Sequence, residues 1–539
     1  MDQHSFVKHA AVYGLCNLLV QAGGVVLLPL YTHYLTPADY GVLEVLGRLA
    51  ETVSTCLIFG GLRQALLTFY QQSTHEAERR RIVTTTLALL ALTCVVGGGL
   101  VLAAAGPLSR ALGRALQAPG AGVSAGLLRL AVLAILLEPL AIIPMTLIQA
   151  RLQSTRFVTI TLSQFLLRLS LCVALVAGLG WGVAGVLLAT VLTTSVFGLG
   201  LCVWELTRSL GRPEWGQVRA LLRFALPFVP GGVGFFILHH GDRFFLLRYG
   251  PEEVGLYALG YKVAQVVSTF SLTPLYMVWS ARMYEEARSP EAPAVFGRAF
   301  TRILAAYLLV GLGLCLFEGE ALAVLAGPAY ARATEVIPIV LLACFFQASA
   351  SLMDAAFYVR HRTGLKLGIT LTATVLMLLL YSLLIPPLGS RGAALATLLG
   401  FAFLAAHTWW TTQRVFPVRY EWPRLLALAA LAGALAGAGR CLPEAAWAWP
   451  VKAALWLALP LTAWQVGLIS RAEKEHVRSL FRRVLKAGPA PLSTFAPAPR
   501  ARGPMPPGPN DAGAAVPVEK GPVYLEWQEG LAPSAGADR

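Results

Sequence analysis

Pro37-Ala38-Asp39-Tyr40-Gly41-Val42-Leu43 reappears 214 residues later as Pro251-Glu252-Glu253-Val254-Gly255-Leu256-Tyr257, with proline, acid and glycine in the same places. An apolar stretch with a cation follows each copy, Arg48 after the first and Lys262 after the second. A second match, of residues 182–190 with residues 389–397, shares the pattern G-x-x-G-x-x-L-A-T at an offset of 207 residues. These matches indicate that the chain contains two copies of one structural unit.

Long apolar segments surround both copies and recur along the chain. Of the 539 residues, 56% are hydrophobic and only 13% are charged, and the mean hydropathy is +0.65. A soluble domain could not bury so much apolar surface, whereas about 20 apolar residues suffice to cross the hydrocarbon core of a bilayer. We therefore expect an all-α polytopic membrane protein with about fourteen transmembrane helices. They are predicted near residues 10–34, 40–69, 82–106, 125–150, 157–178, 181–206, 222–247, 254–281, 299–317, 333–359, 365–385, 391–413, 424–440 and 451–470.

The repeats also predict how the chain is divided. Each repeated stretch lies six predicted spans from its partner, and six is even, so the two copies have the same orientation across the membrane. Two parallel six-helix bundles around a central cavity are typical of alternating-access transporters. The divisions expected are an N-terminal six-helix lobe at 1–206, a cytoplasmic linker at 207–223, a C-terminal six-helix lobe at 222–415, two additional transmembrane helices at 424–470, and a cytoplasmic basic segment with a disordered Pro/Ala/Gly-rich tail at 471–539.

Lysine and arginine are distributed unevenly between the two sets of alternate loops. The set that includes the N-terminus holds 20 of them before the tail, and the other set holds seven. By the positive-inside rule the first set is cytoplasmic, so both termini are expected in the cytoplasm. The formal charge of +15 then reports topology rather than nucleic-acid binding.

Cations inside the predicted spans are the main candidates for function. Each costs about 3 kcal/mol on insertion scales unless it faces protein or water. Acids at the same depth are fewer, so we expect a net positive cavity and a negatively charged cargo, for which phosphate or pyrophosphate fits best. The candidate binding residues are Arg48, Arg63, Arg168, Arg243 and Lys262, while Arg129 begins a span and is expected to reach the interface.

The same charges have a second interpretation, which is pairing within the helix bundle. Glu44, Arg48 and Glu51 lie at i, i+4 and i+7 on one helical face, and Asp242 adjoins Arg243. Glu51 and Asp242 are therefore candidates either for ion coupling or for charge pairing. His239-His240 is a minor candidate for a proton relay, because adjacent residues point to different faces of a helix.

A hinge is predicted at the start of the seventh span. Pro227, Pro230, Gly231 and Gly232 follow one another closely there. Proline removes a helical hydrogen bond and glycine lowers the cost of bending, so the helix should break or bend at this point.

Two motifs that are typical of soluble enzymes occur in the sequence, but their surroundings do not match those of an enzyme site. Gly180-x-Gly182-x-x-Gly185 joins two apolar segments instead of following a strand, and Gly122-x-Ser124-x-Gly126 lies in a loop with no strand before it. The chain has no Gly-x-x-x-x-Gly-Lys-Ser/Thr sequence, and its eight cysteines are scattered singly. We therefore expect no enzyme activity, no cofactor and no metal.

Four stretches resemble a known family. They are Leu27-Leu28-Pro29-Leu30-Tyr31-Thr32-His33-Tyr34-Leu35-Thr36-Pro37-Ala38-Asp39-Tyr40-Gly41, Gly61-Leu62-Arg63-Gln64-Ala65, Asp242-Arg243-Phe244-Phe245-Leu246 and Gly255-Leu256-Tyr257. Over roughly residues 5–470 the chain resembles the polysaccharide-synthesis transporters, a group that includes O-antigen flippases and belongs to the multidrug/oligosaccharidyl-lipid/polysaccharide (MOP) exporter superfamily. The Pro-rich tail departs from the family's pattern.

The resemblance implies two parallel six-helix lobes with twelve to fourteen helices. It also implies flipping of an undecaprenyl-pyrophosphate-linked oligosaccharide across the bacterial cytoplasmic (inner) membrane, for cell-surface polysaccharide synthesis. The partners expected are the lipid-linked oligosaccharide, membrane lipids, a polysaccharide polymerase and glycosyltransferases, and no nucleic acid.

The cargo and the energy source have alternatives. A flippase for the peptidoglycan lipid precursor needs the same cationic cavity. A cation-coupled multidrug antiporter needs an acidic cavity, which the excess of arginine disfavours, and a membrane glycosyltransferase needs acidic external loops, which are short here. The coupling ion, H+ or Na+, is not identified, and exchange of substrate and product down their gradients is equally open.

Overall fold

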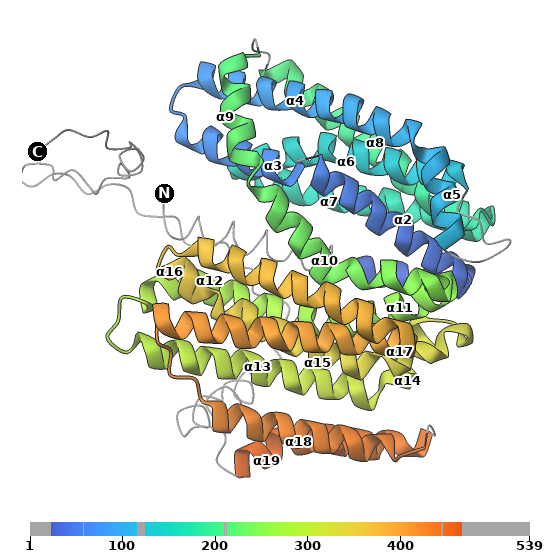
Figure 1. Cartoon of the computed structure of the whole chain (residues 1–539), viewed down its shortest axis with the longest axis vertical. Helices are drawn as coiled ribbons and strands as arrows, with labels where there is room; N and C mark the ends of the chain where they lie inside the picture. The colour runs from blue at the N-terminus through green and yellow to red at the C-terminus, as the bar shows by residue number, and fades with distance from the viewer. Residues whose placement is uncertain are drawn as a thin grey trace, which may run out of the picture. The chain divides into compact units, whose positions relative to one another are not determined.

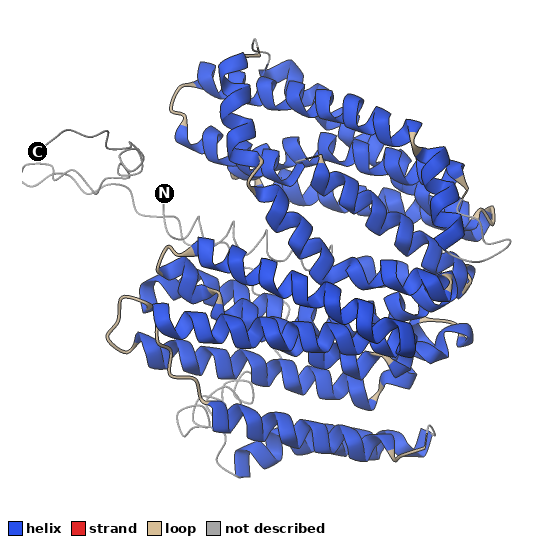
Figure 2. Cartoon of the chain, viewed as in Figure 1, coloured by secondary structure: helices blue, strands red, loops and turns tan. Residues whose placement is uncertain are grey.

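The computed structural model describes residues 23–57, 59–115, 124–209, 211, 213–443 and 446–465. Within these ranges the chain forms helices joined by short turns, without a strand (Figures 1 and 2), so the predicted all-α class is confirmed. The predictions for residues 1–22 and for the segment at 471–539 lie outside the described residues, as does the C-terminal end of the last predicted span.

The N-lobe, as we call residues 23–209, begins with a helical segment at residues 23–34. Thr36 caps the next helix, because its side chain accepts a hydrogen bond from the Asp39 amide while the Asp39 side chain accepts one from the Thr36 amide. The helices are α2 (Pro37–Cys56), α3 (Phe59–Gln72), α4 (Glu76–Ala103), α5 (Ala105–Ala115), α6 (Ala125–Ala150), α7 (Ser154–Cys172), η1 (Val173–Gly178) and α8 (Gly182–Ser209).

The C-lobe, as we call residues 228–415, follows the short helix α9 (Trp215–Ala225). In this lobe α11 continues through the π-helical turn η3 into α12, and α17 contains a kink at Gly389, whose φ is 56°. The helices are α10 (Phe228–Leu246), η2 (Leu247–Tyr249), α11 (Pro251–Val267), η3 (Ser268–Leu272), α12 (Thr273–Glu286), α13 (Ala292–Leu316), α14 (Glu318–Leu325), η4 (Pro328–Glu335), α15 (Ile337–Met353), α16 (Ala355–Val359) and α17 (Thr363–Val415).

The repeat seen in the sequence is a repeat of helices. Helix α3 at residues 59–72 and helix α12 at residues 273–286 have the same length and lie 214 residues apart. The kink at Gly389 divides α17 where its repeat partner Gly182 begins α8, so the single long helix corresponds to two predicted spans. The predicted span at 40–69 is divided near residue 57, where α2 ends and α3 begins.

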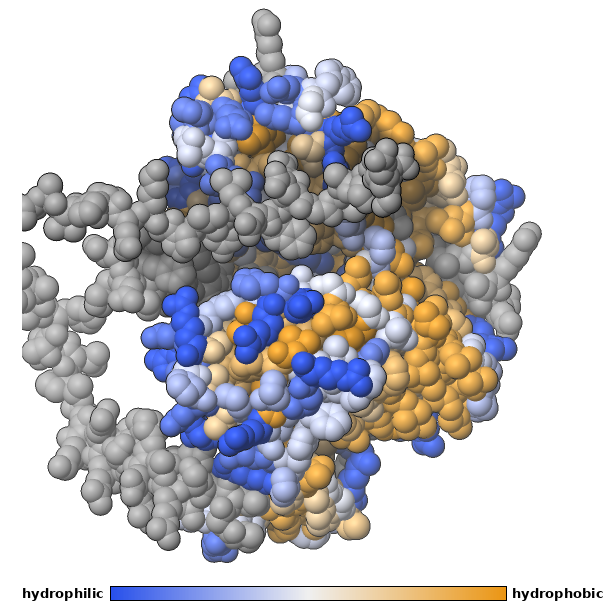
Figure 3. Space-filling model, turned by 60° about the vertical axis from the view of Figure 1, so that its left-hand side comes forward, coloured by the Kyte–Doolittle hydropathy of each residue, from blue (hydrophilic) through white to orange (hydrophobic). Residues whose placement is uncertain are grey.

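The outer surface of the helices is apolar. Val95, Leu100, Val375, Leu383 and Leu426 are more than half exposed although each lies on a long helix. Figure 3 shows a broad band of apolar side chains bordered by hydrophilic ones. Nine helices among the described residues are long and apolar enough to cross a membrane. The protein is therefore a multi-pass membrane protein, and the number fourteen stays a prediction.

The two lobes touch where the repeated sequences begin. A Cβ at Gly41 would lie 1.7 Å from the Pro251 carbonyl oxygen, and one at Gly255 would lie 2.0 Å from that of Pro37. Only glycine permits this approach of α2 and α11. From the C-lobe, the Tyr330 hydroxyl donates to the Leu35 carbonyl at 3.0 Å. The repeated glycines therefore form a close joint between the lobes.

Two more helices, α18 (Trp422–Arg440) and α19 (Trp449–Gln465), pack against α13. The Trp456 indole donates to the Leu309 carbonyl at 2.9 Å. Lys452, which is 5% exposed, places its Nζ 2.5 Å from the Glu320 carboxylate of α14. This ion pair joins the additional helices to the C-lobe.

We expect Lys452→Met to lower the free energy of unfolding by about 1–3 kcal/mol near neutral pH, because it leaves the Glu320 carboxylate without its partner. Burial is the largest single influence on the Glu320 carboxyl and raises its pKa. The hydrogen bond and the charge of Lys452, together with hydrogen bonds from the Glu320 backbone and from Trp449, outweigh burial and hold the pKa below its ordinary value. A lowered pKa contributes stability above the unfolded pKa, and this stability is lost as the pH falls through the folded one.

The melting temperatures of wild type and Lys452→Met in detergent should therefore converge as the pH is lowered toward about 3. Arg440→Met is the matched control, since Arg440 also pairs with an α14 carboxylate, Glu318, but is about half exposed. A difference at Lys452 that stays constant with pH would contradict the role of the ion pair.

Candidate functional site

A network of charged side chains also joins the lobes, in addition to the glycine joint. Glu44, which is 5% exposed, lies on α2 and faces three cations. Its carboxylate is 3.0 Å from Arg48 Nε, 2.9 Å from Lys262 Nζ and 3.7 Å from Arg243 Nε. Lys262 also donates to the Tyr40 hydroxyl at 2.9 Å. Glu44 of the N-lobe thus holds two cations of the C-lobe.

Arg243 is the most deeply buried of these cations, at 2% exposed. Its Nη1 lies 2.7 Å from Asp242 Oδ1 and donates to the His239 carbonyl at 2.9 Å. The rings of Tyr257 and Tyr261 lie 5.6 and 4.5 Å from its guanidinium carbon. A buried guanidinium needs such partners, because removing one side of a buried ion pair costs about 3–5 kcal/mol.

We call Glu44, Arg48, Glu51, Asp242, Arg243 and Lys262 the Glu44 network. Glu51 completes it through an ion pair of 2.5 Å with Arg48. Three cations face three carboxylates, so these six side chains are balanced in charge. In this conformation the charges pair within the helix bundle, as the second interpretation of the sequence expects. Binding of an anion by Arg48, Arg243 or Lys262 stays a prediction.

The adjacent histidines point to different partners, as their spacing on a helix requires. Arg48 Nη1 lies 3.1 Å from His240 Nε2, and Gln347 Nε2 lies 3.2 Å from His239 Nε2. An arginine can only donate, so the His240 nitrogen accepts. The two rings therefore belong to separate contacts.

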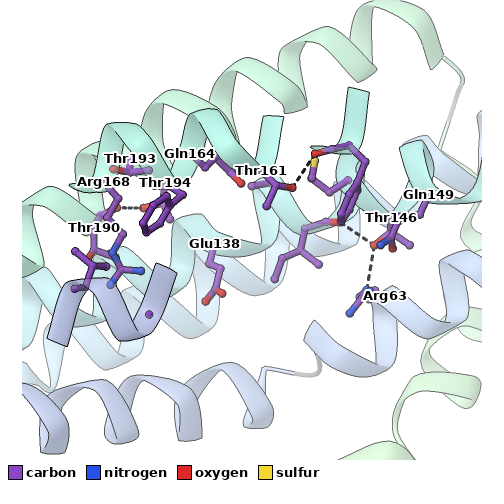
Figure 4. Close-up of a pocket in the computed structure, with 17 residues that line it drawn as sticks. Arg63, Glu138, Thr146, Gln149, Thr161, Gln164, Arg168, Thr190, Thr193 and Thr194 are labelled. Atoms are coloured by element: carbon purple, nitrogen blue, oxygen red, sulfur yellow. Dashed lines mark hydrogen bonds between the residues drawn. The ribbon is translucent and has the colours of Figure 1, made fainter. Parts of the chain in front are cut away.

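The other two candidate arginines line a pocket inside the N-lobe. This N-lobe pocket has a volume of about 430 Å³ and is formed by α3, α6, α7, α8 and the helical segment at residues 23–34. Figure 4 shows Arg63 at one end, Arg168 at the other and Glu138 between them. The uncharged polar residues of its lining are Thr146, Gln149, Thr161, Gln164, Thr190, Thr193 and Thr194.

The arginines of this pocket make no ion pair among the described residues, although Arg168 lies close enough to Glu138 for their charges to interact. Arg63 Nε donates to the Thr146 hydroxyl at 3.1 Å, and the buried Arg168 Nε has no hydrogen-bond partner among the described residues. Within the described part of the chain neither arginine has a carboxylate at ion-pairing distance. With Glu138 as the single acid of the lining, the N-lobe pocket has a net positive charge, which favours an anionic group.

The predicted hinge residues lie at the junction of α9 and α10. The helix is interrupted at Leu226–Pro227, and α10 begins directly after it, whereas Pro230, Gly231 and Gly232 lie within the first turns of α10. A Cβ at Gly232 would lie 2.9 Å from the Thr55 methyl of α2. Movement at this break stays a prediction.

The structure divides the five predicted binding residues into two groups. Arg48, Arg243 and Lys262 belong to the Glu44 network, while Arg63 and Arg168 line the N-lobe pocket. Glu44 is the residue whose importance the sequence did not reveal, because only its spacing from Arg48 is visible there. The sequence did not mark the threonines and glutamines of the pocket as binding residues, since such residues are also common on ordinary helix faces.

The fold is shared with solved membrane transporters, and it encloses a polar pocket inside the helix bundle. The chain superposes on "Lipid II flippase MurJ, inward closed conformation" with a TM-score of 0.67 at 11% identity, covering 88% of this chain and 100% of that one. For an inward-facing multidrug resistance MATE family transporter the TM-score is 0.62 at 15% identity, over 74% of this chain and 94% of the other. At such identities the likeness shows the fold alone.

A family model described as "Polysaccharide biosynthesis protein" matches residues 32–335, more than half of the chain, and the chain belongs to this family. The relative "Probable low-salt glycan biosynthesis flippase Agl15" of Haloferax volcanii is 23% identical over 223 residues. That match covers 40% of this chain and 46% of the relative, so it spans about half of the relative's length. The family predicted from the sequence is thus confirmed.

Proposed function

We propose that this protein is a flippase that moves an undecaprenyl-pyrophosphate-linked oligosaccharide across the bacterial inner membrane for cell-surface polysaccharide synthesis. The observation that carries the proposal is the N-lobe pocket, where two arginines face a single carboxylate. Arginine presents its donors in a fork that matches phosphate oxygens, and a site from which water is partly excluded strengthens this attraction. An anionic cargo supplies the charge that the pocket lacks.

In this proposal Arg63 and Arg168 bind the pyrophosphate in the N-lobe pocket. The threonine hydroxyls of the pocket then supply further hydrogen bonds to its oxygens. The polyprenyl chain stays in the lipid, since its transfer to a polar site is unfavourable, and only the polar head of the cargo enters the protein. The protein changes no covalent bond.

The Glu44 network and the glycine joint close one side of the protein in this mechanism. In this proposal the positive-inside rule assigns that side to the periplasm. Rocking of the lobes breaks the Glu44 pairs and exposes the cargo on the other side.

An ion gradient or the exchange of substrate and product drives the cycle. Of the two candidate carriers of H+ or Na+, Asp242 is held by Arg243 and by the Tyr257 hydroxyl. The Glu51 side chain is 43% exposed, so an ion reaches it more readily. The glycosyltransferases act on the same cargo before its transfer, and the polymerase acts on it afterwards.

Transport of a labelled polyprenyl-pyrophosphate oligosaccharide into proteoliposomes tests the proposal. We expect Arg63→Ala and Arg168→Ala each to lower the initial rate by about ten- to a hundredfold, because each removes a charge-assisted hydrogen bond worth about 1.5–3 kcal/mol. Arg110→Ala is the matched control, since Arg110 is exposed on α5 outside the pocket, and its rate should equal that of wild type.

Equal rates in wild type and both pocket variants, with unchanged melting temperatures, would contradict the role of the pocket. Transport of a peptidoglycan lipid precursor in preference to the oligosaccharide lipid would favour the alternative cargo. The same assay with Arg48→Ala and Lys262→Ala shows whether the Glu44 network also contacts the cargo.

A further inference from the structure

A second pocket lies inside the C-lobe. Its volume is about 450 Å³ and it is formed by α11, η3, α12, α15, α16 and the start of α17. This volume falls in the range of small-molecule sites, about 300–1,000 Å³. We call it the C-lobe pocket, and its uncharged polar lining includes Gln265, Thr269, Thr273, Tyr276, Gln347 and Ser351.

The repeat places the two pockets at corresponding positions of the two lobes. Ala141 and Met145 of α6 line the first pocket, and Ala348 and Leu352 of α15, which lie 207 residues later, line the second. Helices α3 and α12, which contribute to one pocket each, correspond at the offset of 214 residues. The C-lobe pocket is therefore the repeat partner of the N-lobe pocket.

The charges of the two pockets differ. At the same offsets, Met277 corresponds to Arg63 and Val375 corresponds to Arg168, so neither arginine is repeated. The C-lobe pocket contains Asp354 and Lys366, whose charged atoms lie 2.9 Å apart. Its lining is therefore neutral overall, and an anion gains no net attraction there.

The C-lobe pocket offers hydrogen-bonding groups that are not engaged with the protein. The side chains of Gln265, Thr269, Thr273 and Ser351 make no hydrogen bond to another residue in the part of the chain that the structure describes. Amides and hydroxyls both donate and accept, and the Tyr276 ring adds an apolar face to the lining. This set matches a carbohydrate, whose hydroxyls also donate and accept and whose ring faces are apolar.

We propose that the C-lobe pocket binds an uncharged sugar of the transported lipid. This inference rests on the proposed flippase function and deepens it, because the two lobes then divide recognition of one cargo. The N-lobe pocket holds the pyrophosphate through Arg63 and Arg168, and the C-lobe pocket holds the sugar through its amides and hydroxyls.

Binding of two lipids to the purified full chain in detergent tests the division. One probe is polyprenyl pyrophosphate, and the other is the same lipid bearing one N-acetylglucosamine. Wild type should bind the sugar-bearing lipid about tenfold more tightly, as expected for one or two added hydrogen bonds. The double variant Gln265→Leu/Ser351→Ala should lose this preference and keep its affinity for the bare lipid.

Both substituted side chains are exposed to the pocket, so the fold should be retained, which the melting temperature checks. Gln72→Leu, an exposed glutamine at the end of α3, is the matched control and should keep the preference. Arg63→Ala should weaken binding of both lipids by the same factor.

Four outcomes test the C-lobe sugar site and the flippase function separately. A wild type that binds both lipids equally, or a double variant that still prefers the sugar-bearing lipid, would overturn the C-lobe sugar site while leaving the flippase function in place. A double variant that loses affinity for both lipids alike would also overturn the sugar site. A wild type that binds neither lipid would overturn both proposals.

Discussion

Glu44→Gln should lower the free energy of unfolding by about 3–5 kcal/mol and abolish most of the transport activity. The glutamine has nearly the same shape but no charge, so Arg48, Arg243 and Lys262 lose the acid that they share. Arg243 is 2% exposed, and water cannot replace the lost carboxylate. Thermal unfolding in detergent and transport in proteoliposomes measure the two effects.

Glu51→Gln is the matched control for this prediction. Glu51 lies on the same helix and also pairs with Arg48, but its side chain is 43% exposed, and partly exposed pairs contribute only about 0–1 kcal/mol. Its melting temperature should therefore stay close to that of wild type. Similar losses of stability in both variants would show that Glu44 has no special position among the acids of the network.

Gly255→Leu should separate the lobes at the glycine joint. A Cβ at this position lies 2.0 Å from the Pro37 carbonyl oxygen, whereas ordinary contacts begin at 3.4 Å. Because the obstacle is backbone and not a flexible side chain, α2 and α11 must move apart. The conformation in which the lobes touch at the glycine joint then becomes a minor one. Transport should fall severely, since alternating access needs both states.

Spin labels at Tyr34 and Glu252, both exposed, measure this separation as an increase in their distance. Gly47→Leu is the matched control, because Gly47 also lies on α2 but a Cβ there would meet no neighbouring atom of the described chain within 4 Å. That variant should keep the wild-type distance. An unchanged distance in Gly255→Leu would mean that the helix yields locally and that the joint does not hold the lobes together.

The sequence by itself determined the class of this protein and its repeat. Apolar segments must form helices in lipid, since every backbone polar group needs a partner there, and the pairs Gly41 and Gly255 or Gly182 and Gly389 are visible as repeated letters. It also placed Arg63 and Arg168 at membrane depth, and the cost of such charges marked them as candidates.

Tertiary structure alone decided which charges are paired and which remain available. The pair of Glu44 with Arg48 is a local contact that helical spacing reveals, but the pair of Glu44 with Lys262 joins residues 218 positions apart. Likewise, each pocket is assembled by helices that are distant in the chain. Composition and spacing describe one segment at a time, whereas ion pairs and pockets depend on how segments pack, and packing placed Arg243 among carboxylates and Arg63 in an open pocket.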